Sequence, residues 1–242
     1  MILYYIIHFD GAIMIYFRGC LAREKLKNIE NATEAILKHA KIEYRTLDNE
    51  ECCGSFLLRT GFVEDAKEIM KKTLKEIENE KVIVSCAGCY KTFKKDYKEI
   101  LGVEIDVLHT SQLFDSLLKD GIIELEPLDK KVTYHDPCHL GRHLGEYEAP
   151  RNVVSKTANL VEMKLNKDNS RCCGAGAGVR SAYPEITEEI VKMRIEDAKE
   201  VGAELIITAC PFCILNLNSV CLDENKIMDI SQIIIKTLKH SN

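Results

Sequence analysis

Two kinds of hydrophobic pattern alternate along the chain. Short apolar runs rich in β-branched residues predict buried strands at 13–17, 42–47, 81–85 and 103–108, and again at 131–135, 160–163 and 204–208. Apolar residues three and four positions apart predict helices at about 24–40, 63–77, 111–119, 151–158, 186–201 and 228–238. Strands that alternate with helices predict an α/β fold in which helices flank small parallel sheets.

One order of cysteines occurs twice: a single cysteine, then a doublet followed by glycine, then a C-x-x-C pair. The first set comprises Cys20, Cys52, Cys53, Cys86 and Cys89. The second set comprises Cys138, Cys172, Cys173, Cys210 and Cys213. Corresponding cysteines lie 118 to 124 residues apart, which indicates duplicated domains because solenoid repeats run about 20 to 50 residues. Cys221, the eleventh cysteine, is expected to be a buried small residue.

The repeat predicts two similar domains related by internal duplication and a pseudo-twofold axis. We place the first at 14–125 and the second at 126–242, with the boundary in the segment 120–130 and an N-terminal extension at 1–13. Several of the cysteines follow directly on predicted strands. Because ligands of parallel α/β folds gather at the carboxyl ends of the strands, we expect the two sites near the interface of the domains.

Composition narrows the classes of protein further. With 46% hydrophobic residues in 242, the chain is able to bury two cores without disulfides. The formal net charge of -5 is spread along the chain with no long basic stripe, which argues against nucleic acid as a partner.

The apolar N-terminal segment, Met1 to Phe17, raises the question of export. No basic region precedes it, His8 and Asp10 interrupt it, and no small-residue cleavage site follows, so we expect neither a signal peptide nor a transmembrane segment. The start of the chain at Met1 or at Met14 is left open. We therefore expect a reducing, cytoplasmic compartment. Clustered thiols in such a compartment more often hold metal than form disulfides.

Five thiols per set exceed the four ligands of tetrahedral zinc. The side chains of an adjacent pair such as Cys52 and Cys53 diverge, so the pair suits two irons of one cluster better than one ion. The compact C-x₂-C-x₂-C-x₃-C-P spacing of bacterial ferredoxins is absent, so each site must assemble from several strand-end loops. Glycines beside the cysteines leave room for a bulky inorganic core. They are Gly54, Gly88, Gly174, Gly176 and Gly178.

These motifs resemble the cysteine-rich CCG domain found in the B-type and D-type catalytic subunits of heterodisulfide reductase. The same domain occurs in iron-sulfur subunits of glycolate and lactate oxidation and of succinate or fumarate enzymes. The matches look most like the D-type subunit and cover nearly all the chain from about residue 14. They lie at 16–20, 51–55, 58–61, 85–90, 108–113, 135–143, 172–176 and 210–213.

The resemblance implies one noncubane [4Fe-4S] cluster in each set of five cysteines, at which a disulfide is cleaved in one-electron steps. In some relatives one site holds zinc or is degenerate, but both sets are complete here, so we expect two clusters. The D-type subunit carries an N-terminal ferredoxin domain that this chain lacks. Electrons are therefore expected from a separate ferredoxin-type iron-sulfur or flavin-containing subunit, and the substrate is expected to be a small thiol or disulfide.

Three histidines, His135, His139 and His143, flank the single cysteine of the second set. Pro137 breaks the helix on which all three would share a face, which disfavours direct ligation. We expect them near the second cluster, as a proton donor to a leaving thiolate or a hydrogen-bond donor to sulfide. His139 and His143 are the catalytic candidates, together with Arg142 as a partner for an anionic group of the substrate or as part of a structural ion pair.

Other candidates have simpler interpretations. Arg59 and Arg180 are weaker candidates for anion binding, and His109 is expected to be a structural loop residue. The glycines of 174–178 resemble a dinucleotide loop, but they follow the doublet instead of ending a strand, which argues against nucleotide binding.

The leading hypothesis is an oxidoreductase subunit that reduces a disulfide, such as a heterodisulfide of thiol coenzymes. The first alternative is an electron-transfer subunit of a glycolate, lactate, succinate or fumarate type oxidoreductase. A zinc-bound assembly protein is the second, and five ligands per site argue against it. No feature of the sequence separates the first two hypotheses.

Overall fold

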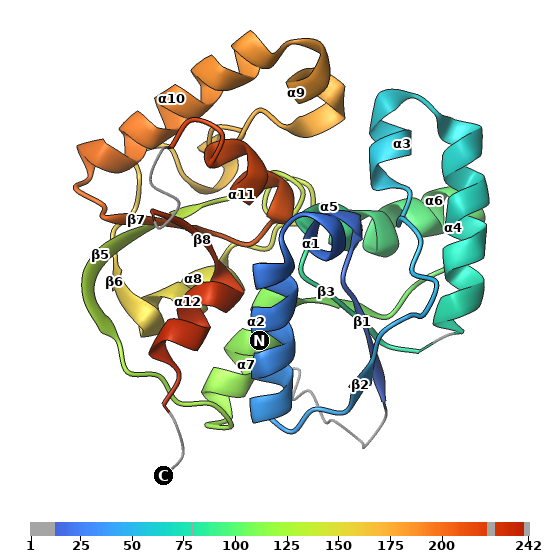
Figure 1. The fold of residues 1–242 in the computed structure, drawn as a ribbon, viewed down its shortest axis with the longest axis horizontal. Helices are drawn as coiled ribbons and strands as arrows, with labels where there is room; N and C mark the ends of the chain where they lie inside the picture. Colours follow the sequence, from blue (N-terminus) through green and yellow to red (C-terminus); the bar gives the residue numbers. More distant parts are fainter. Residues whose placement is uncertain (1–12, 79, 222–225, 240–242) are drawn as a thin grey trace.

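Two parallel four-stranded sheets, one in each half of the chain, form the framework of the protein (Figure 1). The computed structural model describes residues 13–78, 80–221 and 226–239. The strand orders are β2-β1-β3-β4 and β6-β5-β7-β8, so corresponding strands occupy corresponding places. The predicted duplicated α/β fold is confirmed. The predicted N-terminal extension lies outside the described residues except for Ile13.

The elements of the first half follow one another as strand and helix. They are β1 (Met14–Phe17), α1 (Cys20–Glu24), α2 (Lys27–His39), β2 (Tyr44–Arg45), α3 (Ser55–Thr60), α4 (Val63–Ile77), β3 (Val82–Val84), α5 (Ala87–Lys91), the π-helical turn Thr92–Asp96, α6 (Tyr97–Leu101), β4 (Val107–His109) and α7 (Thr110–Lys119).

The second half repeats this plan with additional short turns. Its elements are β5 (Leu128–His135), α8 (Glu148–Thr157), β6 (Ala158–Leu160), the 3₁₀ turns Lys167–Asn169 and Gly176–Gly178, α9 (Val179–Ala182), α10 (Pro184–Glu200), β7 (Leu205–Thr208), α11 (Pro211–Leu217), β8 (Ile227–Asp229) and α12 (Ile230–Thr237).

The predicted elements differ from the observed ones mainly at short segments. The helix expected at 24–40 corresponds to α2, which begins at Lys27 after the separate short helix α1, and the strand expected at 160–163 lies earlier, at β6. The helix expected from 228 begins at Ile230, because the residues before it form β8. The short helices α1, α3, α5, α9 and α11 span at most two turns, too few for a hydrophobic period to stand out.

Apolar periodicity explains why the long elements form. Every residue of β1, β3 and β7 is buried, as expected for central parallel strands covered on both faces. Helix α2 buries one stripe at helical spacing against the core. The stripe comprises Ile29, Ala32, Thr33, Ile36 and Leu37.

Two capping boxes begin equivalent helices in the two halves. His109 accepts a hydrogen bond from the backbone N–H of Ser111 at the start of α7, and Asp229 accepts one from Ser231 at the start of α12. Gln112 and Gln232 complete the boxes by accepting from the backbone N–H of the capping residues. The capping contact supports the structural interpretation of His109.

Helices from opposite halves pack against one another between the two sheets (Figure 1). Helix α2 packs against α12, and α7 packs against α8. Since α2 corresponds to α8 and α7 to α12, these two contacts are equivalent under the pseudo-twofold relation. The end of the chain also returns to the linker, where Leu238 bridges to Leu125. The two sheets fall on either side of this linker, while the domain limits 14–125 and 126–242 stay predictions.

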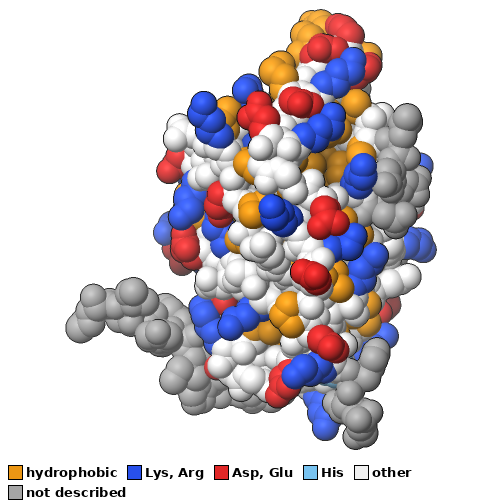
Figure 2. Space-filling model, turned by 90° about the vertical axis from the view of Figure 1, so that its left-hand side faces the viewer, with side chains coloured by type: hydrophobic (Ala, Val, Ile, Leu, Met, Phe, Trp, Pro, Cys, Tyr) orange, Lys and Arg blue, Asp and Glu red, His pale blue; other side chains and the backbone are white. Residues whose placement is uncertain are grey.

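Charges of both signs are interspersed on the surface of the second half. Figure 2 shows Lys and Arg side chains among Asp and Glu side chains, with only small apolar areas between them. A face of this kind offers no single-sign field for nucleic acid. Among the described residues, no helix combines the length and apolar character that crossing a bilayer requires.

Gly54 and Gly61, which precede and follow α3, provide a matched test of local packing. Both have φ near +90°, but a Cβ on Gly54 would lie 2.8 Å from Met70 Cγ, whereas one on Gly61 would meet nothing within 4 Å. Backbone strain costs each alanine variant about 1 to 2 kcal/mol, and the overlap adds about 1 to 3 kcal/mol to Gly54→Ala alone. We expect Gly54→Ala to have the lower melting temperature by circular dichroism. Equal losses would contradict the tight contact with Met70.

Candidate metal centre

Four of the motif cysteines lie at the carboxyl ends of central strands. Cys20 begins α1 after β1, Cys86 caps α5 after β3, and Cys210 caps α11 after β7. Cys138 follows β5 after two residues. Helices α1, α5 and α11 lie close together between the two halves (Figure 1). The predicted placement of the cysteines is therefore confirmed by the geometry of both sheets.

The C-x-x-C pairs each occupy the first turn of a short helix. Because residues three apart share one face of a helix, Cys86 and Cys89 present their thiols to the same side, and so do Cys210 and Cys213. All four are buried. The doublets precede α3 in the first half and the Gly176–Gly178 turn in the second, and in each the second cysteine is buried while the first is half-buried.

All ten motif thiols lie close together in one continuous series along the wall of a single cavity. Each thiol contacts the next in the order Cys20, Cys52, Cys53, Cys89, Cys86, Cys210, Cys213, Cys173, Cys172 and Cys138. The centre of the series is the contact between Cys86 and Cys210, which are equivalent residues of the two repeats. The two sets of five are thus adjacent.

Three of the ten motif thiols, those of Cys52, Cys172 and Cys210, have a lowered pKa, with hydrogen bonds from neighbouring thiols as the main cause. Hydrogen bonds from Cys20 and Cys53 lower the pKa of Cys52 to about 3, and those from Cys138 and Cys173 lower the pKa of Cys172 to about 2. Donation to Cys52 raises the pKa of Cys20. Cys52, Cys172 and Cys210 therefore carry negative charge more readily than the other motif cysteines. The backbone N–H of Gly174 lies 3.4 Å from Cys172 Sγ.

A cavity lies over the thiols and is lined by both repeats. All ten motif cysteines contribute to its wall. Phe56, Arg59, Phe212 and His139 line it as well. A cavity that reaches both sets of thiols offers one small molecule simultaneous contact with both.

Glu50 anchors the loop of the first doublet to the end of β1. Its carboxylate accepts hydrogen bonds from the backbone N–H groups of Arg18, at 3.0 Å, and Gly19, at 2.8 Å. Burial raises the pKa of Glu50, while these hydrogen bonds and the Arg18 guanidinium act in the opposite direction. Since Gly19 precedes Cys20 and Glu50 nearly adjoins Cys52, this carboxylate fixes two ligand loops relative to one another.

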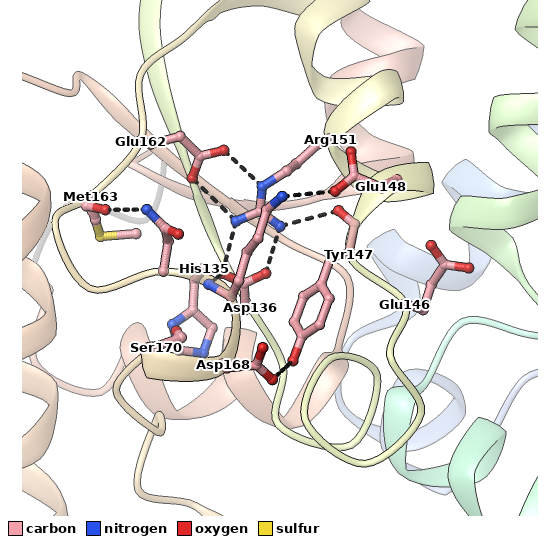
Figure 3. Close-up of polar contacts among 12 residues, drawn as sticks. His135, Asp136, Glu146, Tyr147, Glu148, Arg151, Glu162, Met163, Asp168 and Ser170 are labelled. Atoms are coloured by element: carbon pink, nitrogen blue, oxygen red, sulfur yellow. Dashed lines mark hydrogen bonds and ion pairs between the residues drawn. The ribbon is translucent and has the colours of Figure 1, made fainter.

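Asp136 has a similar role in the second half, where the carboxylate lies at the strand end and not in the doublet loop (Figure 3). Arg151 donates to both oxygens of Asp136, at 2.7 and 3.0 Å, and also to Glu162. The backbone N–H of Lys167 donates to Asp136 at 2.9 Å. The network joins the strand end before Cys138 to the segment that leads to the second doublet.

The two histidines nominated as catalytic lie at different depths. His139 is half-buried, lines the cavity and faces Gly88 of the first repeat, where a Cβ would lie 3.6 Å from His139 Nδ1. Burial lowers the pKa of His139 to about 4, although the nearby Cys210 acts in the opposite direction. His143 is exposed and packs edge-on against His139, with ring centroids 4.9 Å apart.

The candidate arginines also differ in whether they line the cavity. Arg142 is exposed and donates to the backbone carbonyl of Ser170, and Arg180 donates to Asn216 Oδ1; neither lines the cavity. Arg59 lines it and pairs with Asp96 at 2.5 Å. The structure thus brings His139 and Arg59 to the thiols and leaves His143, Arg142 and Arg180 outside the cavity wall.

Sequence reasoning missed Glu50, Arg151 and the two cavity phenylalanines, Phe56 and Phe212. Phe56 and Phe212 lie within a few residues of motif cysteines, so their position next to the motifs was a usable signal. Arg151 had no such signal, because its partnership with Asp136 depends on how α8 packs against the end of β5.

The residues present fit an iron-sulfur group better than a single zinc ion. Ten thiols in two contiguous sets exceed what two tetrahedral sites use. Gly88 leaves open space between Cys86 Sγ and His139 Nδ1 that a side chain would fill. Thiolate ligands beside backbone N–H groups are typical of iron-sulfur sites.

Comparison with known proteins gives a consistent result. The family model of the CCG cysteine-rich domain matches twice, at residues 14–94 and 132–218. The chain is 41% identical over 220 residues to the D-type subunit of Dihydromethanophenazine:CoB–CoM heterodisulfide reductase from Methanosarcina acetivorans, which covers 86% of this chain and 54% of the relative. It is 33% identical over 229 residues to the B-type subunit of Fumarate reductase (CoM/CoB) from Methanothermobacter marburgensis, covering 93% of this chain and 46% of the relative.

The chain therefore spans about half the length of these relatives. The residues that the family model matches include both cysteine sets. Two matches of one model, in the same order as the two sheets, agree with the duplication seen in the structure. The chain belongs to the CCG cysteine-rich domain family.

Proposed function

We propose that this chain is an iron-sulfur oxidoreductase subunit that reduces a small disulfide at clusters held by its two cysteine sets. The observation that carries the proposal is the continuous series of ten thiols along a cavity lined by both repeats. The similarity to one component of a heterodisulfide reductase supports a disulfide of thiol coenzymes as the substrate class. Electrons come from a partner iron-sulfur or flavin-containing subunit.

Each set of five cysteines would hold one [4Fe-4S] cluster of the noncubane kind. A bound cluster supplies one-electron transfer and affinity for thiolate sulfur. The protein supplies the rest: Phe56 and Phe212 line the cavity with apolar surface, and Arg59 offers a positive charge to an anionic substrate. The alternative is that one of the two cysteine sets holds zinc in place of a cluster, and metal analysis distinguishes the two cases.

His139 is proposed to protonate the thiolate product, because negative charge developing on sulfur beside the ring would raise the lowered pKa of His139, as Cys210 already does in part. His139 lines the cavity between the second cysteine set, to which Cys138 belongs, and Gly88 of the first. His143 packs against its ring from the exposed side and is proposed to support its position. Arg142 remains a proposed partner for an anionic group that projects beyond the cavity.

The test measures iron, acid-labile sulfide and zinc per chain on protein purified without oxygen. We expect about eight irons and as many sulfides, the content of two [4Fe-4S] clusters. A paramagnetic signal of the oxidised protein that appears or shifts on addition of a thiol coenzyme supports chemistry at sulfur. Zinc without sulfide would overturn the proposal.

The similarity to one component of a fumarate reductase favours a second function, electron transfer without a disulfide substrate. In that case the two adjacent cysteine sets would only relay electrons between partner subunits. This second function would be favoured over the first if iron and sulfide reach the expected content but the paramagnetic signal does not change on addition of thiols or disulfides.

His139→Ala should slow disulfide reduction about 100-fold, the usual contribution of a positioned proton donor, and leave iron content close to wild type. The assay uses a reduced viologen dye as electron donor. His143→Ala is the matched control, and its effect should be smaller because this ring is exposed and does not line the cavity. A loss of iron that parallels the loss of turnover in His139→Ala would show a structural role instead.

A further inference from the structure

His135 is a buried polar residue that the proposed function does not use. It is the last residue of β5, three positions before Cys138, and its exposed fraction is 0%. Its side chain lies at the strand end beside Asp136 (Figure 3). A polar ring buried this completely needs hydrogen-bond partners for both of its nitrogens.

One nitrogen of His135 has a partner that fixes the position of the ring proton. Arg194, also 0% exposed, donates from Nε to His135 Nδ1 at 3.0 Å. The same guanidinium donates to the carbonyl of Leu165, to Ser170 Oγ and to Asp197. Because a guanidinium only donates, Nδ1 must carry the lone pair, and the proton of the neutral ring must lie on Nε2.

The other nitrogen, Nε2, is buried and has no hydrogen-bond partner among the described residues. A ring nitrogen of His135 and the Sγ atoms of Cys173 and Cys213 lie within 4.8 Å of one another. Since Arg194 occupies Nδ1, the group left to face the two sulfurs is Nε2–H. An N–H in this place donates to a thiolate, and the same proton prevents Nε2 from ligating a metal.

The first repeat has phenylalanine at the equivalent position. Phe17 is the last residue of β1 and lies three positions before Cys20, as His135 lies before Cys138. Both residues pair in register with the neighbouring central strand, Phe17 with Val84 and His135 with Thr208. Phe17 is fully buried and packs edge-on against Phe93, with ring centroids 5.0 Å apart.

We propose that His135 donates its Nε2–H to the sulfurs of Cys173 and Cys213, that Arg194 holds the ring in this tautomer, and that the two cysteine sites therefore differ in electronic character. The inference rests on the proposed function, since it assigns His135 a role toward the group bound by the second set. His135 is a positioning residue and does not ligate the metal.

The expected consequence is an unequal pair of reduction potentials. A hydrogen bond to a ligating sulfur stabilises the reduced state, which carries more negative charge, and so raises the potential of its cluster. The second site would have this bond from His135, whereas Phe17 stands at the equivalent position of the first. We therefore expect the second site to be the easier one to reduce.

The direct test uses the full chain with ¹⁵N-labelled histidine and pulsed paramagnetic resonance of the anaerobically purified protein. We expect a weak coupling between a histidine ¹⁵N nucleus and the electron spin of the cluster, because the nitrogen would contact the cluster only through a hydrogen bond from its N–H to sulfur. A strong coupling would identify His135 as a ligand, and no coupling in protein with full iron content would show that the ring does not contact the cluster; either result overturns the inference. Protein without iron would instead contradict the proposed function.

Variants assign the coupling to His135 and test its effect. His135→Phe, which copies the residue of the first repeat, should abolish the coupling and lower the midpoint potential of the second site. His135→Gln, whose amide reaches near the position of Nε2, should restore the potential toward wild type. Measurement in a Cys53→Ala background isolates the second site, and iron content confirms assembly. An unchanged potential in His135→Phe with full iron content would also overturn the inference.

Discussion

Replacing Cys173 with alanine is expected to remove one of two clusters and leave the other. Cys173 contacts Cys172 and Cys213 within the second set and belongs to the half that has its own sheet. Iron should fall from about eight to about four atoms per chain, because the first set retains all of its thiols. Colorimetric iron and sulfide analysis of anaerobically purified protein measures the change.

Cys53→Ala is the matched variant, since Cys53 holds in the first set the place that Cys173 holds in the second. It should also remove about half of the iron, and the spectroscopic signal that remains should be that of the second cluster. The fold should survive both changes because a buried cysteine packs as a small apolar residue. Unchanged iron in either variant would remove that set from the proposed ligands.

Replacing Arg151 with methionine is expected to destabilise the protein by about 3 to 5 kcal/mol, the usual effect of leaving a buried charge without its partner. The side chains of Arg151 and Asp136 are only 8% and 3% exposed, so water does not replace the lost hydrogen bonds. Arg151 also lies over the ring of Tyr134, at 5.3 Å from its centroid. The measurement is the shift in denaturant midpoint.

The double variant Asp136→Asn with Arg151→Met is the control, because it removes both charges together. It should recover part of the lost stability, whereas Arg151→Met alone should also lose iron from the second set, since Asp136 positions the segment through Lys167. A single variant as stable as wild type would show that the buried pair contributes little to the fold.

The sequence was sufficient to predict the layers of the fold and the cysteines of the centre. Strand ends are recognisable because apolar runs such as 81–85 stop at a cysteine, and parallel topology then brings those ends to one edge. The short helices α5 and α11 were not predicted, because they are one or two turns long and show no hydrophobic period.

The sequence predicted both sites near the interface of the domains, but the spacing of the cysteines did not reveal that the two sets contact one another. The contact between Cys86 and Cys210 depends on how α2 packs against α12 and α7 against α8, which is a tertiary property of the two halves together. The roles of Arg194 and Arg151 also depend on tertiary packing, since each side chain extends from a helix to the end of strand β5. By contrast, the capping boxes at His109 and Asp229 have a local pattern, a cap with glutamine three positions later.

The crossed packing of α2 on α12 and α7 on α8 has a consequence for the ancestry of the chain. A contact made twice by equivalent surfaces about a twofold axis is the isologous contact of a homodimer. A polypeptide with a single repeat of this kind would have the surfaces to assemble a double centre from two identical copies. In one chain each repeat varies alone, and Phe17 and His135 at equivalent positions are a difference that identical subunits are unable to acquire.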